Sequence, residues 1–117
     1  EVDFFVGDLA GALRPGSVDL LVSNPPYVPL ADLPGLQREL RAEPAKALFG
    51  GEDGLETYRR LMPQAAAVLR PGGRLLLELG YHIRPAVEAM LPDDEWEHPE
   101  VKHDLAGLDR VLTVRRQ

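Results

Sequence analysis

The chain has 117 residues, 44% of them hydrophobic, which is enough for one small domain with an apolar core. It contains no cysteine, which excludes disulfides and thiolate zinc sites. No apolar run approaches the ~20 residues that a membrane helix needs, and the N-terminus lacks the pattern of a signal peptide. The formal net charge of -6 disfavours a phosphate backbone as a partner. These features fit a cytoplasmic protein that binds neither membrane nor nucleic acid.

Two short apolar runs lie near the start of the chain, at 2–6 and 18–23. Nearly continuous apolar runs of this length are typical of strands buried on both faces of a parallel sheet. We therefore predict a strand over each run, with a turn at 14–17 between them. The second predicted strand ends at once, because Pro25 and Pro26 cannot donate backbone hydrogen bonds.

The rest of the chain contains further predicted helices and strands. Apolar residues at helical spacing predict a helix over 55–69, and Pro63 is expected to kink or restart it. Before this helix, residues 28–53 show no clean hydrophobic periodicity. We therefore expect a long connection there, with a short helix near 36–41. The elements predicted after it are a buried strand at 75–79, a short helix at 84–91, and two strands at 96–102 and 110–114 joined by a turn around Gly107.

The order of these elements predicts an α/β fold. Strands that are separated by helices imply parallel pairing, with the helices on the faces of the sheet. The final two strands are too close together for a parallel crossover, so we expect them to form an antiparallel hairpin. The sequence therefore predicts one domain, with a parallel sheet that ends in an antiparallel hairpin.

The segment Asn24-Pro25-Pro26-Tyr27 is the candidate site, because ligands of open α/β sheets bind beyond the carboxyl ends of the strands. The Asn24 side chain offers an amide acceptor and an amide donor, and the backbone carbonyl of Pro25 is free to point into a site. The ring of Tyr27 can stack on a planar group. Together these groups suit methylation of an amide or exocyclic amine, mostly by positioning and electrostatics. Taken alone, the tetrapeptide also fits a simple turn.

Longer patterns resemble a known family. Residues 18–27, Val-Asp-Leu-Leu-Val-Ser-Asn-Pro-Pro-Tyr, resemble the strand-four motif of methyltransferases that act on amino groups. These enzymes include nucleobase methyltransferases and the HemK/PrmC release-factor glutamine methyltransferases. The block from Glu43 to Tyr58 is similar to the signature that the HemK/PrmC family carries downstream of that motif. The stretches 69–80 and 104–111 fit the same family, so the resemblance covers the whole chain.

This resemblance implies a Rossmann-like class I S-adenosyl-L-methionine-dependent methyltransferase fold, of which the chain would hold strands 3–7. In the family's sheet order, 3-2-1-4-5-7-6, residues 1–6 correspond to strand three and residues 18–23 to strand four. The implied activity is methylation of the side-chain amide of the glutamine in the Gly-Gly-Gln loop of a peptide chain release factor, with S-adenosyl-L-methionine as the cofactor.

The resemblance also implies roles for individual residues. Asn24 and the carbonyl of Pro25 would accept the two hydrogens of the substrate amide, and Asn24 would also lie beside the methyl donor. Pro26 and Tyr27 would complete the substrate site, with the Tyr27 ring packed nearby. No metal is implied.

The chain departs from the family on the cofactor side. Asp8 and Leu9 match the end of the family's third strand, beside the adenine of the cofactor. The Gly-rich loop after strand one, the acidic residue after strand two and the N-terminal docking domain have no counterpart. We therefore expect residues 1–117 to be the C-terminal part of the catalytic domain and to be inactive alone. The strand at 18–23 would then be an exposed edge, beside which either residues 1–6 or a second chain would pair.

The sequence leaves two other functions open. The first is a methyltransferase that acts on the amino group of a nucleic-acid base, although the acidic charge and the block from Glu43 to Tyr58 count against it. The second is a non-catalytic interaction domain that kept the fold. Glu78 ends a predicted strand near the site, where a structural role and a functional role fit equally well. The three histidines, His82, His98 and His103, lack metal-ligand spacing.

Overall fold

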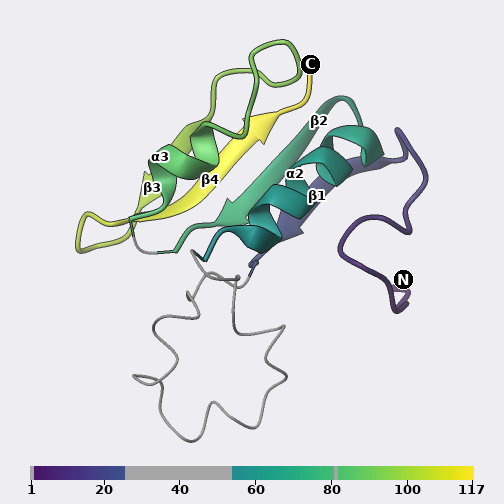
Figure 1. Ribbon diagram of the computed structural model, residues 1–117, viewed down its shortest axis with the longest axis horizontal. Coiled ribbons are helices and arrows are strands. Elements are labelled where there is room, and N and C mark those ends of the chain that lie inside the picture. Colours follow the sequence, from purple (N-terminus) through teal and green to yellow (C-terminus); the bar gives the residue numbers. More distant parts are fainter. Residues whose placement is uncertain (1, 26–53, 81) are drawn as a thin grey trace, which may run out of the picture.

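The computed structural model describes residues 2–25, 54–80 and 82–117 (Figure 1). Within these ranges four strands form one sheet in the order β1-β2-β4-β3. β1 and β2 are parallel, whereas β4 is antiparallel to both β2 and β3, which confirms the predicted parallel sheet with a terminal hairpin. The elements are β1 (Val18–Ser23), α2 (Glu56–Val68), β2 (Leu69–Glu78), α3 (Arg84–Glu88), β3 (Glu100–His103) and β4 (Asp109–Arg115).

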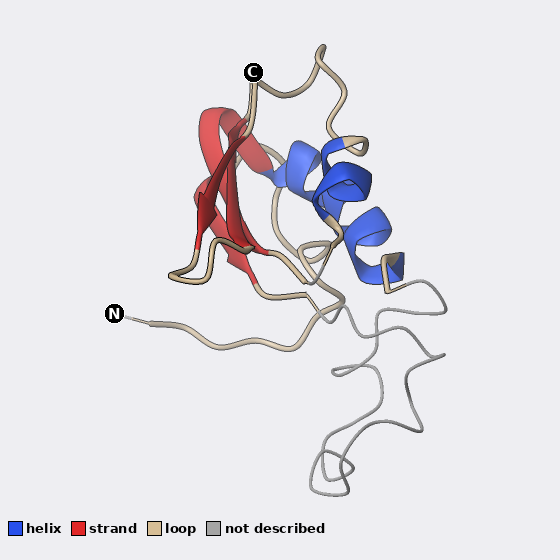
Figure 2. Ribbon diagram, turned by 90° about the vertical axis from the view of Figure 1, so that its left-hand side faces the viewer, coloured by secondary structure: helices blue, strands red, loops and turns tan. Residues whose placement is uncertain are grey.

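The hydrophobic core lies between one face of the sheet and the helices (Figure 2). Alternate residues of β2 point into it, because side chains along a strand alternate between the two faces. Leu75 and Leu77 are fully buried, and so are Tyr58 and Ala65 on the apolar side of α2. The predicted helix at 55–69 is thus confirmed as α2. The structure assigns one uninterrupted helix across Pro63, so the helix does not restart there.

The opposite face of the sheet is open in the described part of the chain. Leu20 and Val22, which alternate with the inward-facing Leu21, are 54% and 65% exposed. Among the described strands, β1 pairs only with β2, so its other edge is unpaired. β1 is therefore the edge strand that the sequence predicted at 18–23.

The predicted strand at 2–6 is wrong. Residues 2–7 have no assigned secondary structure and are exposed, and they do not pair with the free edge of β1. A strand forms only where its backbone groups find hydrogen-bond partners on a neighbour. This segment pairs with none of the described strands, so its apolar side chains alone do not make it a strand. The pairing of residues 1–6 beside β1, one of the two expected arrangements, is therefore not found.

Several element boundaries also differ from the prediction. β2 starts at Leu69, directly after α2, and not at residue 75 as predicted, so it includes the Arg-Pro-Gly-Gly segment. The strand accommodates this segment through an irregular register with β1 and a positive φ of 85° at Gly72. A Cβ on Gly73 would lie 2.9 Å from the carbonyl oxygen of Arg70, so this position requires glycine.

The C-terminal elements are shorter than predicted, except for β4. α3 ends at Glu88, and β3 begins only at Glu100, while Trp96 forms an isolated bridge to Arg116. The predicted turn around Gly107 is confirmed, with a positive φ of 81° at that residue. The short helix near 36–41 lies outside the described residues. No helix of the described ranges is long and apolar enough to cross a membrane.

Candidate active site

The candidate site lies where β1 and β2 end side by side. Ser23 and Leu77 are register partners, so the residues that follow them, Asn24 and Glu78, leave the two parallel strands at the same level. This is the edge of a parallel sheet at which ligands bind. The structure places an open groove of about 260 Å³ here, which we call the site groove. Its lining consists of Val22, Ser23, Asn24, Leu76, Leu77, Glu78 and Val111.

One of the predicted site residues lies at this groove. Asn24 is exposed and is among the residues that line the groove, whereas Pro25, the next residue along the chain, is buried and is not part of the lining. An exposed amide beside a buried proline gives a polar group on a fixed section of backbone. Pro26 and Tyr27 lie outside the described residues, so their predicted roles remain predictions.

Glu78 contributes a carboxylate to the site groove. Its backbone carbonyl accepts a hydrogen bond from the hydroxyl of Tyr58 at 2.6 Å, which ties the end of β2 to α2. The next amide, that of Leu79, donates to the carbonyl of Arg110 at 2.7 Å. Within the described ranges, the half-buried Glu78 side chain forms no hydrogen bond or ion pair. The strand end is thus fixed at its backbone, while its carboxylate remains available to a ligand.

The segment that contains Asp8 and Leu9, the predicted neighbours of the cofactor, contacts α2. The carboxylate of Asp8 forms an ion pair with Arg60, and Leu9 has a positive φ of 56° in the turn that follows. The amide of Ala10 then donates to the side-chain oxygen of Gln64 at 2.8 Å. In the described part of the chain, no hydrogen bond or ion pair connects Asp8 or Leu9 with Asn24. The structure therefore brings Asn24 and Glu78 together at the groove and places Asp8 in a different set of contacts.

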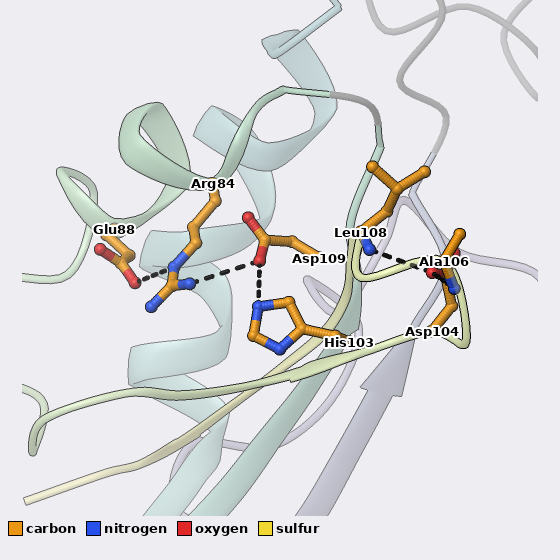
Figure 3. A network of polar contacts seen from close by, with 7 residues as sticks. All are labelled: Arg84, Glu88, His103, Asp104, Ala106, Leu108 and Asp109. Atoms are coloured by element: carbon orange, nitrogen blue, oxygen red, sulfur yellow. Dashed lines mark hydrogen bonds and ion pairs between the residues drawn. The ribbon is translucent and has the colours of Figure 1, made fainter.

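A polar network connects α3 with the hairpin beside the site groove (Figure 3). The guanidinium of Arg84 donates to Glu88 at 2.9 Å and to Asp109 at 3.3 Å. The same Asp109 oxygen lies 2.9 Å from Nε2 of His103. The hydrogen bond to Glu88 is the main reason that the pKa of Arg84 is raised. Arg84 thus anchors the start of β4 to α3.

The hairpin turn is organised by Asp104 (Figure 3). One oxygen of its carboxylate accepts hydrogen bonds from the amides of Ala106 and Leu108, at 2.9 Å and 3.0 Å, and the other oxygen accepts from Arg110 at 3.0 Å. These bonds lower the pKa of Asp104, and the largest contribution comes from the Leu108 amide. The side chain of Asp104 therefore closes the turn in its ionised form.

The lowered pKa of Asp104 predicts that the turn loosens in acid. Because the pKa of the folded state lies below the ordinary value of 3.8, the stabilisation is fully present above that value and is lost as the pH falls through the folded-state pKa. In an NMR titration, the amide resonances of Ala106 and Leu108 should therefore hold their positions down to about pH 4 and shift below it. An Asp104→Asn variant, whose amide oxygen accepts without titrating, should lack this shift. A transition that starts above about pH 5 would contradict the assignment.

Some groove residues were not found by sequence reasoning. Val22 and Val111, which line the groove, were predicted only as strand residues. The signal that could have indicated them is the strand register, because residues at the carboxyl ends of adjacent parallel strands share an edge. That register depends on the irregular pairing near Gly72, which no periodicity in the sequence reveals.

The fold is that of S-adenosylmethionine-dependent methyltransferases. A putative DNA modification methylase from Thermus thermophilus, crystallised with S-adenosyl-L-methionine, matches 91% of this chain over 48% of its own length, with a TM-score of 0.57 and 17% identity. At this identity the similarity concerns the fold alone. The observed order β1-β2-β4-β3 also matches strands 4-5-7-6 of the sheet that the sequence resemblance implied.

Sequence comparison then finds relatives that share one name. The chain is 44% identical over 118 residues to the release factor glutamine methyltransferase of Moorella thermoacetica, covering 100% of this chain and 42% of that relative. It is 45% identical over 116 residues to the protein of the same name from Deinococcus radiodurans, covering 99% of this chain and 41% of that relative. No family model matches. Over nearly its whole length the chain is thus similar to release factor glutamine methyltransferases, and it spans about two fifths of the length of these curated relatives.

Proposed function

We propose that this chain supplies the amide-binding side of the active site of a protein-(glutamine-N5) methyltransferase whose substrate is a peptide chain release factor. The observation that carries the proposal is the position of Asn24 at the end of β1, where it lines the site groove beside Glu78. The names of the relatives that are 44% and 45% identical to the chain support the choice of substrate. The proposed target is the glutamine of the Gly-Gly-Gln loop.

The proposed chemistry depends mainly on position. The side-chain oxygen of Asn24 and the carbonyl of Pro25 accept the two hydrogens of the substrate amide, which favours a pyramidal nitrogen with its lone pair directed at the methyl group. S-adenosyl-L-methionine, when bound, supplies that methyl group as an electrophile. An N–C bond forms as the C–S bond breaks, and the nitrogen then releases one proton. Because the proton leaves after the transfer, no strong base is needed to activate the amide.

The described residues fit the substrate side of this reaction better than the cofactor side. Asn24 is exposed at the groove, where it can contact both ligands, but the Asp8 carboxylate is already paired with Arg60. We therefore propose that the main contacts to S-adenosyl-L-methionine, including a Gly-rich loop, come from the part of the relatives' length that this chain does not span. The unpaired edge of β1 is the proposed contact for a further strand, either from that part or from a second copy of the chain.

Methyl transfer tests the proposed function directly. A full-length methyltransferase that carries this chain should transfer labelled methyl groups from S-adenosyl-L-methionine to an intact release factor and should leave duplex DNA unlabelled. A release factor whose Gly-Gly-Gln glutamine is replaced by alanine serves as the control and should remain unlabelled. Labelled DNA with an unlabelled release factor would contradict the proposal and would favour a nucleobase methyltransferase.

A further inference from the structure

The tip of the β3–β4 hairpin exposes two leucines. Leu105 is fully exposed, and Leu108 is 41% exposed. Both lie in the turn that connects the two strands. Single exposed apolar side chains are common on protein surfaces and need no explanation by themselves. Two leucines in one short turn suggest a function only if the turn is held in one conformation and lies near a functional site. Both conditions are met here.

The turn is held in one conformation by the contacts of Asp104. Besides its side-chain bonds to the amides of Ala106 and Leu108, its backbone accepts from the amide of Gly107 at 3.0 Å and donates to the carbonyl of Leu108 at 2.9 Å. Gly107 has the positive φ that this compact turn requires. A contact surface that is fixed before binding loses little conformational entropy when a partner binds. The two leucines are thus presented on a pre-organised support.

The turn also lies at the same end of the sheet as the site groove. Val111, which follows the turn on β4, lines the groove together with Asn24. A second hollow of about 110 Å³ extends from the end of β2 to the turn, and Gly80, His82, Leu108 and Asp109 contribute to its lining. Figure 1 shows the β3–β4 turn at the end of the sheet toward which β1 and β2 run. The two leucines and Asn24 therefore lie at the same end of the sheet.

We propose that Leu105 and Leu108 form a docking surface for the folded body of the protein substrate, outside the glutamine that is methylated. The inference rests on the proposed function, and it assigns part of the recognition of the protein substrate to this turn. The site groove has room for one substrate side chain and the residues beside it. When a glutamine on a loop enters the groove, the rest of the substrate protein therefore lies against the edge of the sheet. The partner surface is an apolar recess, because the residues that the turn presents to it are leucines, and such contacts gain from the removal of apolar surface from water.

Comparison of two substrates tests the docking surface in the full-length methyltransferase. The variant Leu105→Ser/Leu108→Ser should raise the KM for an intact release factor by about tenfold or more, since truncation of buried interface residues commonly has effects of this size. The KM for a short peptide that contains only the Gly-Gly-Gln loop should stay unchanged. The matched control is Ala106→Ser, which alters an exposed side chain of the same turn and should leave both KM values unchanged.

The outcomes separate this inference from the function on which it rests. Normal transfer by the variant with an unchanged KM for the intact release factor would overturn the docking surface alone. An equal loss with the peptide and with the intact protein would also overturn it, because the turn would then act on the site itself. If the unmodified enzyme methylates neither substrate, the proposed function fails and the docking surface fails with it.

Discussion

Replacing Asn24 by alanine is expected to lower the kcat of methyl transfer by about 100-fold or more, the usual effect of removing one pre-positioned polar group from a site where charge develops. Among the described residues, Asn24 provides the one side-chain amide in the lining of the site groove. Without it, the substrate nitrogen loses the acceptor that orients its lone pair. The measurement is single-turnover methyl transfer to a release factor by the full-length enzyme.

The same experiment distinguishes a catalytic loss from misfolding. Because Asn24 is exposed and lies beyond the last residue of β1, the substitution should leave the thermal midpoint of unfolding nearly unchanged. The control is Ser17→Ala at the opposite end of β1, which removes an exposed hydroxyl bonded to the carbonyl of Arg14. That variant should keep its kcat. An Asn24→Ala enzyme that retains more than about a tenth of its kcat would show that the proposed acceptor is not needed.

Replacing Leu77 by alanine is expected to reduce the free energy of unfolding of the chain by about 2–5 kcal/mol. Leu77 is fully buried in β2, and it pairs with Ser23 of β1 on one side and with Leu112 of β4 on the other. Truncation leaves a cavity at the centre of the core that the neighbouring strands cannot easily fill. Chemical denaturation of the 117-residue chain measures the change.

The matched control for Leu77 is Leu20→Ala, the same substitution on the open face of the sheet. Leu20 is 54% exposed, so its truncation removes much less buried area and should cost well under about 1 kcal/mol. Equal losses for the two variants would contradict the placement of the core between the helices and one face of the sheet.

The sequence predicted the fold well where local pattern and tertiary environment agree. α2 and β1 were predicted nearly to the residue, because the helical spacing at Tyr58 and Ala65 and the apolar run at 18–23 both find a partner surface. The run at 2–6 carries a similar apolar signal, yet it is exposed and without strand pairing. Apolar composition indicates that a segment can be a strand, but the neighbouring strand decides whether it becomes one.

The candidate site was predicted only in part, for a physical reason. Asn24 could be found because its position after an apolar run and before two prolines is a local feature of the sequence. The grouping of Asn24 with Glu78 and Val111 depends on the register of β1, β2 and β4, which local patterns do not specify. The ion pair between Asp8 and Arg60, a residue far away in sequence, likewise could not be predicted from local patterns.

Tandem mass spectrometry of a release factor after reaction is the most direct test of the central claim, that the site at the end of β1 holds an amide nitrogen for methylation. The full-length enzyme with S-adenosyl-L-methionine should add the mass of one methyl group, and fragmentation should place it on the side chain of the Gly-Gly-Gln glutamine. The Asn24→Ala enzyme should leave that peptide unmodified under the same conditions. A methyl group on another residue, or equal modification by both enzymes, would contradict the account.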